Sequence, residues 1–298
     1  MKLIKTTLTG IGQIFLQENG LSGLLITVGM FFSHWTLGVA CFLGSLIGTL
    51  TAQILKFPED EIRRGLYGFN ASLCFMCTMF TFGIPDASNP LIWLIGLIAS
   101  VISTLLMRAF VKRGKPAFTF PFVLSCWIFC WGTARFGLFG LSQTTPPLVP
   151  ADTFGGVAEP FYAWAEVNFG SSIWDGVFLF AAIAVSSPQA AMWGMAATPV
   201  GAVLAHYLLG IDDNTLANGL YGFSAILVAC VFSGSRLRDF ICVMFGILLA
   251  VVIQYAVSQT GLAAYTFGFI AASWIMLPFR ARLSSYDIDA EIRKLLNP

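Results

Sequence analysis

Few side chains in this sequence of 298 residues could carry covalent chemistry. The two histidines, His34 and His206, stand near the ends of apolar runs, and no H-E-x-x-H, Ser-His-Asp or phosphate-loop pattern accompanies them. The seven cysteines lie within apolar runs at spacings that fit no zinc motif, so we expect small buried side chains rather than metal ligands. The sequence therefore predicts no enzyme, no cofactor and no metal.

Other residues recur in matched pairs along the chain. The phrase GLYGFNASL returns 154 residues later as GLYGFSAIL. Phe69 and Leu73 are four residues apart and therefore share one face of a helix, and Phe223 and Leu227 repeat that arrangement. Ordinary helix packing also produces such pairs, so the informative feature is their duplication beside two copies of GLYG, whose glycines allow close backbone approach.

Hydrogen-bonding side chains recur on the same plan. The segments AFTFPFV and AYTFGFI match, which aligns Thr119 with Thr266, and Gln13 falls opposite Glu166 when the glycines that follow them are aligned. Their hydroxyl, amide and carboxylate oxygens can accept hydrogen bonds. Each threonine can alternatively bond to a carbonyl of its own helix.

The elements that must position these residues are membrane helices. Hydrophobic residues make up 57% of the chain and charged residues only 10%, whereas a soluble domain carries roughly 25% charged residues. The composition predicts a polytopic, all-α membrane protein in contact with the lipid bilayer. We expect ten apolar spans, at about 21–33, 36–55, 63–83, 91–111, 118–141, 172–186, 189–209, 217–233, 239–258 and 262–279.

The basic residues indicate the orientation. With the N-terminus in the cytoplasm and ten alternating spans, fifteen of the sixteen lysines and arginines fall in cytoplasmic segments, and only Arg135 lies toward the other side. Both termini are therefore expected in the cytoplasm. Nothing in the charge pattern indicates a nucleic-acid partner.

The paired segments divide the chain into two homologous halves, residues 1–150 and 151–298, each with five spans. An odd number of spans per half gives the halves opposite orientations, so the sequence predicts an inverted repeat. Such repeats place a pore or binding site near the bilayer midplane, on the pseudo-twofold axis. Few acidic residues lie within the spans, which favours an uncoupled channel over an ion-coupled carrier.

GLYGFN preceded by FPEDEI, together with GIGQIFLQENGLSG and PAFTFPF, resembles the segments of the urea transporter family. With the second copies, the resemblance covers nearly the whole chain, and the length resembles that of a bacterial member. It implies a homotrimer in the bacterial inner membrane, with a passive urea-selective pore in each protomer. It also implies a re-entrant pore half-helix in each half.

The resemblance further assigns roles along a flattened filter. The apolar walls of this flat slot look like Phe69, Leu73, Phe223 and Leu227. The hydrogen-bond acceptors midway along the pore look like Thr119 and Thr266. Gln13 and Glu166 are expected at the starts of the two half-helices, as caps or as acceptors for entering urea. The complete predicted lining is Gln13, Leu16, Phe69, Leu73, Thr119, Glu166, Val167, Phe223, Leu227 and Thr266.

Two other functions stay open at this level. The first is a pore for another small neutral solute, either ammonia or a short amide; histidines in mid-span would favour ammonia, but His34 and His206 lie near span ends. The second is a membrane-embedded enzyme or a scaffold. No catalytic set supports the enzyme, and a scaffold would not need matched slot residues.

Overall fold

The computed structural model describes residues 2–84, 87–141, 143 and 156–285. All regular structure within these residues is helical. The predicted all-α class is therefore confirmed for the described part of the chain.

The described residues of the first half form a series of helices joined by short turns. In order, the elements are α1 (Lys2–Gly12), η1 (Gln13–Phe15), α2 (Gly20–Ser33), α3 (Trp35–Ile54), α4 (Glu59–Arg63), α5 (Phe69–Thr78), η2 (Met79–Gly83), α6 (Pro90–Lys112), α7 (Phe120–Cys126), η3 (Trp127–Gly132), α8 (Thr133–Arg135) and η4 (Leu138–Gly140).

The second half has a similar order of helices. They are α9 (Glu159–Glu166), α10 (Ile173–Ser186), α11 (Pro188–Leu209), α12 (Asp213–Ala217), α13 (Gly222–Phe232), α14 (Leu237–Gln259) and α15 (Phe267–Ser285). Lengths agree closely between counterparts: α2 and α10 have 14 residues each, α4 and α12 have 5 each, and α6 and α14 have 23 each.

Local sequence explains where several helices begin. The Asn19 side chain accepts a hydrogen bond from the Leu21 amide at the start of α2, and Asn89 does the same for Leu91 at the start of α6. His34 ends α2, and its Nδ1 accepts from the Thr36 amide to cap α3. His34 thus has a structural role at a helix junction.

Two glycines allow the first helix of each half to pack against the second. A Cβ on Gly23 would lie 1.8 Å from the Leu8 carbonyl oxygen, and a Cβ on Gly176 would lie 1.8 Å from the Phe161 carbonyl oxygen. Only a residue without a Cβ permits backbones to approach this closely. The same glycines therefore produce the same contact, α1 on α2 and α9 on α10.

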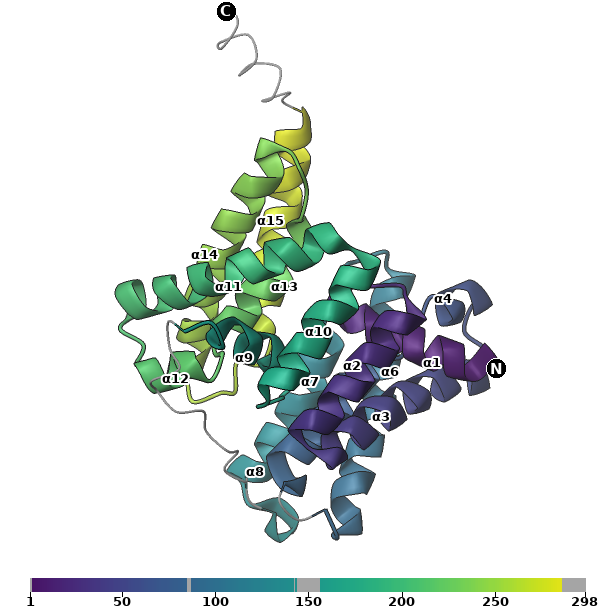
Figure 1. Ribbon diagram of the computed structural model, residues 1–298. Coiled ribbons are helices and arrows are strands. Elements are labelled where there is room, and N and C mark those ends of the chain that lie inside the picture. The colour runs from purple at the N-terminus through teal and green to yellow at the C-terminus, as the bar shows by residue number, and fades with distance from the viewer. Residues whose placement is uncertain (1, 85–86, 142, 144–155, 286–298) are drawn as a thin grey trace, which may run out of the picture.

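The two halves meet where α2 packs against α10. Figure 1 shows these helices side by side, with purple-to-blue helices on one side of them and green-to-yellow helices on the other. Ser33 Oγ donates to Asp175 Oδ2 over 2.7 Å, and Ser22 Oγ donates to the Ala182 carbonyl over 2.6 Å. Buried polar contacts thus join the halves at both ends of this helix pair.

Helical segments lie at all ten expected ranges, but not all have the length and hydropathy of a simple span. Within the described residues, α3, α6, α11 and α14 meet that standard, and α1–η1 with α2 forms a further apolar pair bent by 78°.

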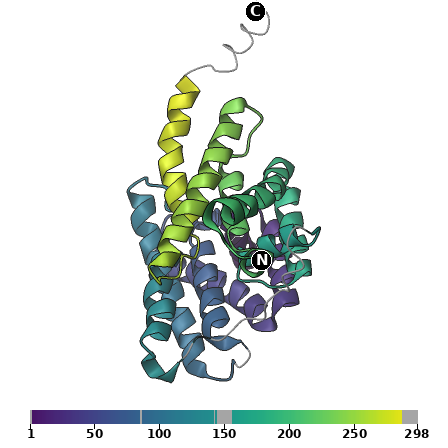
Figure 2. The ribbon, with the colours of Figure 1, turned by 90° about the vertical axis from the view of Figure 1, so that its left-hand side faces the viewer.

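Figure 2 shows α14 beside α15, and the C-terminal part of α15 carries Arg280 and Arg282. Large apolar side chains such as Ile54, Leu97 and Val203 are exposed, as a lipid-facing surface requires.

Candidate functional site

Thr119 and Thr266 meet at the contact between the two halves. Their Oγ1 atoms lie 2.7 Å apart, and the two side chains are 3% and 4% exposed. Each hydroxyl can donate one hydrogen bond and accept two, so the pair retains acceptor capacity beyond its mutual bond. The threonine hydroxyls therefore pair with each other across the halves rather than with carbonyls of their own helices.

The backbone places both threonines at helix starts. Phe118 and Tyr265, the preceding residues, adopt positive φ values of 48° and 43°. The Thr119 carbonyl then accepts from the Val123 amide, and the Thr266 carbonyl accepts from Ile270. The left-handed residue before each threonine turns the chain into α7 or α15 and brings the two helix starts together.

Aromatic contacts around the threonines have the same internal symmetry. Phe118 lies 5.3 Å from Phe269 and Phe122 lies 5.5 Å from Tyr265, measured between ring centroids. Adding the Thr119–Thr266 separation of 147 residues to Phe118 and Phe122 gives Tyr265 and Phe269, so either contact maps onto the other. This exchange is the contact pattern of a twofold relation between the two segments.

Asn70 holds the backbone on both sides of Thr119. Its Oδ1 accepts from the Phe122 amide over 3.0 Å, and its Nδ2 donates to the Phe118 carbonyl over 3.2 Å. Nδ2 also lies 3.7 Å from Met107 Sδ on α6. The asparagine of the GLYGFN phrase thus braces the segment that presents Thr119.

The second half uses a different polar pair at the equivalent place. Ser224 stands where Asn70 stands in the first half, and its Oγ donates to Gln254 Oε1 over 2.6 Å. Gln254 is the counterpart of Met107 at the 147-residue spacing. In the first half the amide side chain therefore belongs to α5, which begins within the GLYGFN phrase, whereas in the second half it belongs to α14. Because Gln254 on α14 supplies the amide, the second phrase can carry serine in place of asparagine.

The four predicted slot residues are all buried. Phe69 and Phe223 are each 5% exposed, Leu73 is 1% exposed and Leu227 is 3% exposed. The helix α5, which carries the first pair, packs against η1, and α13, which carries the second, packs against α9. Each Phe/Leu pair therefore lies on a helix that contacts the first helix of its half.

A cavity of about 240 Å³ brings four predicted residues together. Glu166, Val167, Phe223 and Thr266 line it. Gln254, Phe169 and Tyr265 also contribute, although the sequence analysis did not select them. Among the described residues of this lining, Glu166 is the one that belongs to the acidic and basic residue types. Of the remaining predicted residues, Thr119 contacts the cavity wall through Thr266, and Gln13, Leu16, Phe69, Leu73 and Leu227 are not part of this lining.

The predicted positions of Gln13 and Glu166 at helix starts are wrong. Gln13 directly follows the last residue of α1, and Glu166 is the last residue of α9. Helix C-termini present free carbonyl groups, so these side chains cannot cap backbone amides there. Gln13 instead donates from Nε2 to the Arg64 carbonyl over 2.8 Å.

Leu16 and Val167, which were both predicted to line the path, do not occupy equivalent positions in the two halves. Leu16 has a positive φ of 61° and is 41% exposed, whereas Val167 has a φ of −51° and is 3% exposed. The residue with the matching left-handed backbone in the second half is Phe169, with a φ of 67°. The positive φ agrees with the spacing, since Leu16 and Phe169 each stand three residues after the aligned Gln13 and Glu166, and identifies Phe169 as the counterpart of Leu16.

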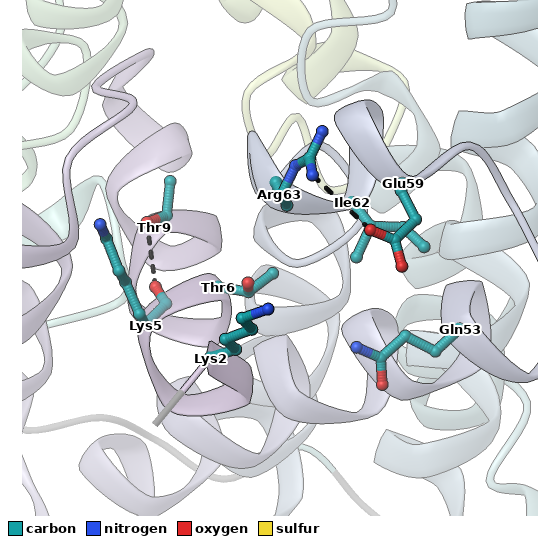
Figure 3. A pocket seen from close by; sticks show the side chains of 8 residues that line it. All are labelled: Lys2, Lys5, Thr6, Thr9, Gln53, Glu59, Ile62 and Arg63. Atoms are coloured by element: carbon teal, nitrogen blue, oxygen red, sulfur yellow. Dashed lines mark hydrogen bonds and ion pairs between the residues drawn. The ribbon is translucent and has the colours of Figure 1, made fainter.

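A second cavity, of about 430 Å³, lies away from the threonines (Figure 3). Its lining includes two lysines of α1, Lys2 and Lys5. It also includes Glu59 and Arg63 of α4, whose side chains form an ion pair over 3.7 Å. This lining is highly charged and exposed. The cavity at Thr266 is better suited to a small neutral solute because its wall is aromatic with a few hydrogen-bonding groups.

Three buried cysteines also come together. The Sγ atoms of Cys77, Cys126 and Cys130 all lie within 4.8 Å of one another. The expectation that the cysteines are buried is confirmed, since all seven are. The sequence analysis missed their convergence because Cys77 belongs to a different helix; the four-residue spacing of Cys126 and Cys130 was the available signal.

Comparisons with known proteins find related sequences over nearly the whole chain. A family model described as "Urea transporter" matches residues 4–281. Urea transporter 1 of Rattus norvegicus is 26% identical over 294 residues, which cover 91% of this chain and 75% of the relative. Urea transporter 1 of Ovis aries is 25% identical over 301 residues, covering 93% and 77%.

Proposed function

The chain belongs to the urea transporter family, and we propose that it conducts urea passively along a path past Thr119 and Thr266. It is a multi-pass membrane protein whose transported solute is urea. The observation that carries the proposed path is the 2.7 Å contact of the two threonine hydroxyls beside the 240 Å³ cavity.

The chemistry of urea fits this lining. Urea is flat and neutral, and its N–H groups and carbonyl oxygen are hydrated in water. Removing that hydration without replacement costs several kcal/mol. Phe223 and Val167 supply apolar walls for the flat faces, while Glu166 and Thr266 supply acceptors for N–H groups at the edge.

The path continues into the first half from the threonine pair. Phe69 and Leu73 form the second pair of slot walls, on the helix that packs against η1. Gln13 and Leu16, at and just after η1, line the other mouth. Leu227 continues the wall formed by Phe223 on α13. A narrow path of this kind excludes ions, because it cannot replace an ion's hydration shell.

The fold behind this path is a pair of inverted five-helix repeats, with ten crossings in all. Matching helix lengths, matching glycine contacts and the exchange of contacts between Phe118, Phe122, Tyr265 and Phe269 support the twofold relation. The short helices α1 and α9 serve as the two pore half-helices, and the 78° bend after η1 is compatible with a re-entrant segment.

The protein resides in a bacterial inner membrane with both termini in the cytoplasm, and it assembles as a homotrimer with one path per protomer. The distribution of lysine and arginine supports the orientation. The exposed apolar side chains provide surface for lipid and for neighbouring protomers.

Solute flux into proteoliposomes tests the proposal. Stopped-flow light scattering should show faster urea entry than in empty vesicles, while acetamide and ammonia in parallel runs report the other neutral solutes. Glu166→Gln keeps the shape and a carbonyl acceptor and should retain most of the flux, whereas Glu166→Leu should lower it. Urea entry at the rate of empty vesicles would overturn the proposal.

A further inference from the structure

The three-cysteine cluster joins two helices that carry proposed path residues. Cys77 lies on α5, eight residues after Phe69, and Cys126 ends α7, which begins immediately after Thr119. Cys130 lies in η3, one turn after Cys126. All three side chains are 0% exposed, and their Sγ atoms lie within 4.8 Å of one another.

Local structure directs the sulfur atoms toward a common point. The Thr78 hydroxyl lies 3.5 Å from Cys130 Sγ, and the Thr81 hydroxyl lies 4.0 Å from Cys77 Sγ. The helices on both sides change to π-helical geometry here, in η2 directly after α5 and in η3 directly after α7. Single π-helical turns inside α-helices are frequent at functional sites.

The second half shows that packing alone does not require these thiols. At the repeat spacings of 154 and 147 residues, the counterparts of Cys77, Cys126 and Cys130 are Val231, Ser273 and Leu277. Valine and leucine stand at two of these positions, where both are partly buried, so the shared order of helices does not itself require sulfur there. The thiols therefore represent something that the first half has in addition to the shared fold.

Three thiols are suited to a soft metal ion. Sulfur atoms about 2.3 Å from a shared ion would lie about 4 Å apart in a trigonal site, so a contraction of less than about 1 Å would close the cluster. Structural zinc sites almost always have four ligands, whereas this cluster supplies three. Thiolates favour Cu(I) among soft ions, and a monovalent ion needs the release of only one thiol proton for neutrality in this buried place.

The cluster also lies behind the wall of the 240 Å³ cavity. Thr81, one turn after Cys77, and Phe122, one turn before Cys126, both line that cavity. An ion held by the three sulfurs would tie α5 to α7 and η3, and so limit the movement of Phe69, Leu73 and Thr119 relative to one another. Thr81 both lines the cavity and lies 4.0 Å from Cys77 Sγ, so an ion that entered from the cavity would arrive on this side of the cluster.

We propose that Cys77, Cys126 and Cys130 form a binding site for a soft monovalent metal ion of the Cu(I) class, and that its occupancy slows urea conduction. Binding exchanges a thiol proton for the metal ion, with no oxidation step. The effect on conduction rests on the proposed function, whereas metal binding does not.

Metal binding is measured on the purified full chain with silver(I) nitrate, and with Cu(I) held reduced by ascorbate, followed by dialysis and elemental analysis. We expect about one ion per chain and a loss of affinity of roughly 100-fold or more in Cys77→Val/Cys126→Ser/Cys130→Leu. That variant copies the second half, so the fold is expected to accept it. Cys41→Ala and Cys230→Ala, which remove buried thiols outside the cluster, should bind like the parent.

Urea flux in proteoliposomes provides the second measurement. Silver(I) should slow urea entry in the parent and in Cys41→Ala, but not in the triple variant. Equal metal binding by parent and triple variant would overturn the inference, as would a disulfide formed in place of metal uptake, or binding without any change in flux. A failure of the proposed function is distinguishable, because the metal-free parent would then conduct no faster than empty vesicles.

Discussion

The hydroxyls of Thr119 and Thr266 lie 2.7 Å apart although 147 residues separate them in the chain. Each hydroxyl belongs to the residue immediately before a helix, and each follows an aromatic residue with a positive φ. The two sites are thus built alike and meet directly. A solute that passes between the halves here encounters two equivalent oxygens.

Replacing Thr266 with valine should lower urea flux roughly fivefold, because one hydrogen bond contributes about 1 kcal/mol. Thr119→Val should have a similar effect. Thr266→Ser keeps the hydroxyl and serves as the matched control. Stopped-flow light scattering gives the rates, and a valine variant that conducts like the parent would remove the hydroxyl from the path.

Asn70→Ala should destabilise the protein by about 1–3 kcal/mol, because the buried Phe122 amide loses its acceptor and the Phe118 carbonyl loses its donor. Thermal unfolding in detergent, followed by tryptophan fluorescence, measures the change. An unchanged melting temperature would show that this brace contributes nothing to stability.

The two halves place different side-chain pairs, Asn70 with Met107 and Ser224 with Gln254, at equivalent positions, and this difference gives an independent prediction. Ser224→Asn combined with Gln254→Met copies the Asn70–Met107 pair into the second half. We expect the double variant to be more stable than the two single changes imply, by about 0.5–3 kcal/mol in a double-mutant cycle. Strict additivity of the single effects would argue against the equivalence of these pairs.

Gly23→Ala should prevent normal folding or lower stability by at least about 1–3 kcal/mol, because its Cβ would lie 1.8 Å from the Leu8 carbonyl oxygen. Gly20→Ala on the same helix is the control, since its Cβ would meet no heavy atom closer than 3.6 Å. Expression level and size-exclusion elution compare the two. Equal behaviour would contradict the close packing of α1 on α2.

The proposed inverted repeat places counterpart helix ends on opposite faces of the membrane. Lys112 ends α6 and Gln259 ends α14, 147 residues later, and both are exposed. A cysteine at Lys112 should react with a membrane-impermeant maleimide from the cytoplasmic side, and one at Gln259 from the other side. The seven native cysteines are buried and should give little background. Labelling of both positions from one side would exclude the inversion.

The sequence predicted more of the helices than of the site. Apolar runs located helical segments well, because hydrophobicity and repeat spacing are local features of the chain. The positions of Gln13 and Glu166 at helix starts were wrong because apolar periodicity does not reveal where a short helix ends; the left-handed residues that follow, Leu16 and Phe169, decide that.

Contacts between distant segments were less accessible still. The alignment of Thr119 with Thr266 followed from the repeat, but their direct contact depends on how two whole halves pack. Likewise, Gln254 stood in an ordinary apolar run, and only the structure places it beside Ser224. Residues whose role depends on tertiary proximity leave little trace in a single sequence.

Urea uptake with and without ion gradients tests the central claim most directly. Proteoliposomes containing the purified protein are loaded with the same sodium and proton concentrations inside and outside, or with a gradient of either ion, and radiolabelled urea entry and exit are timed. Passive conduction predicts equal rates in all cases, in both directions, and well above those of empty vesicles. Uptake that follows the sodium or proton gradient would contradict it.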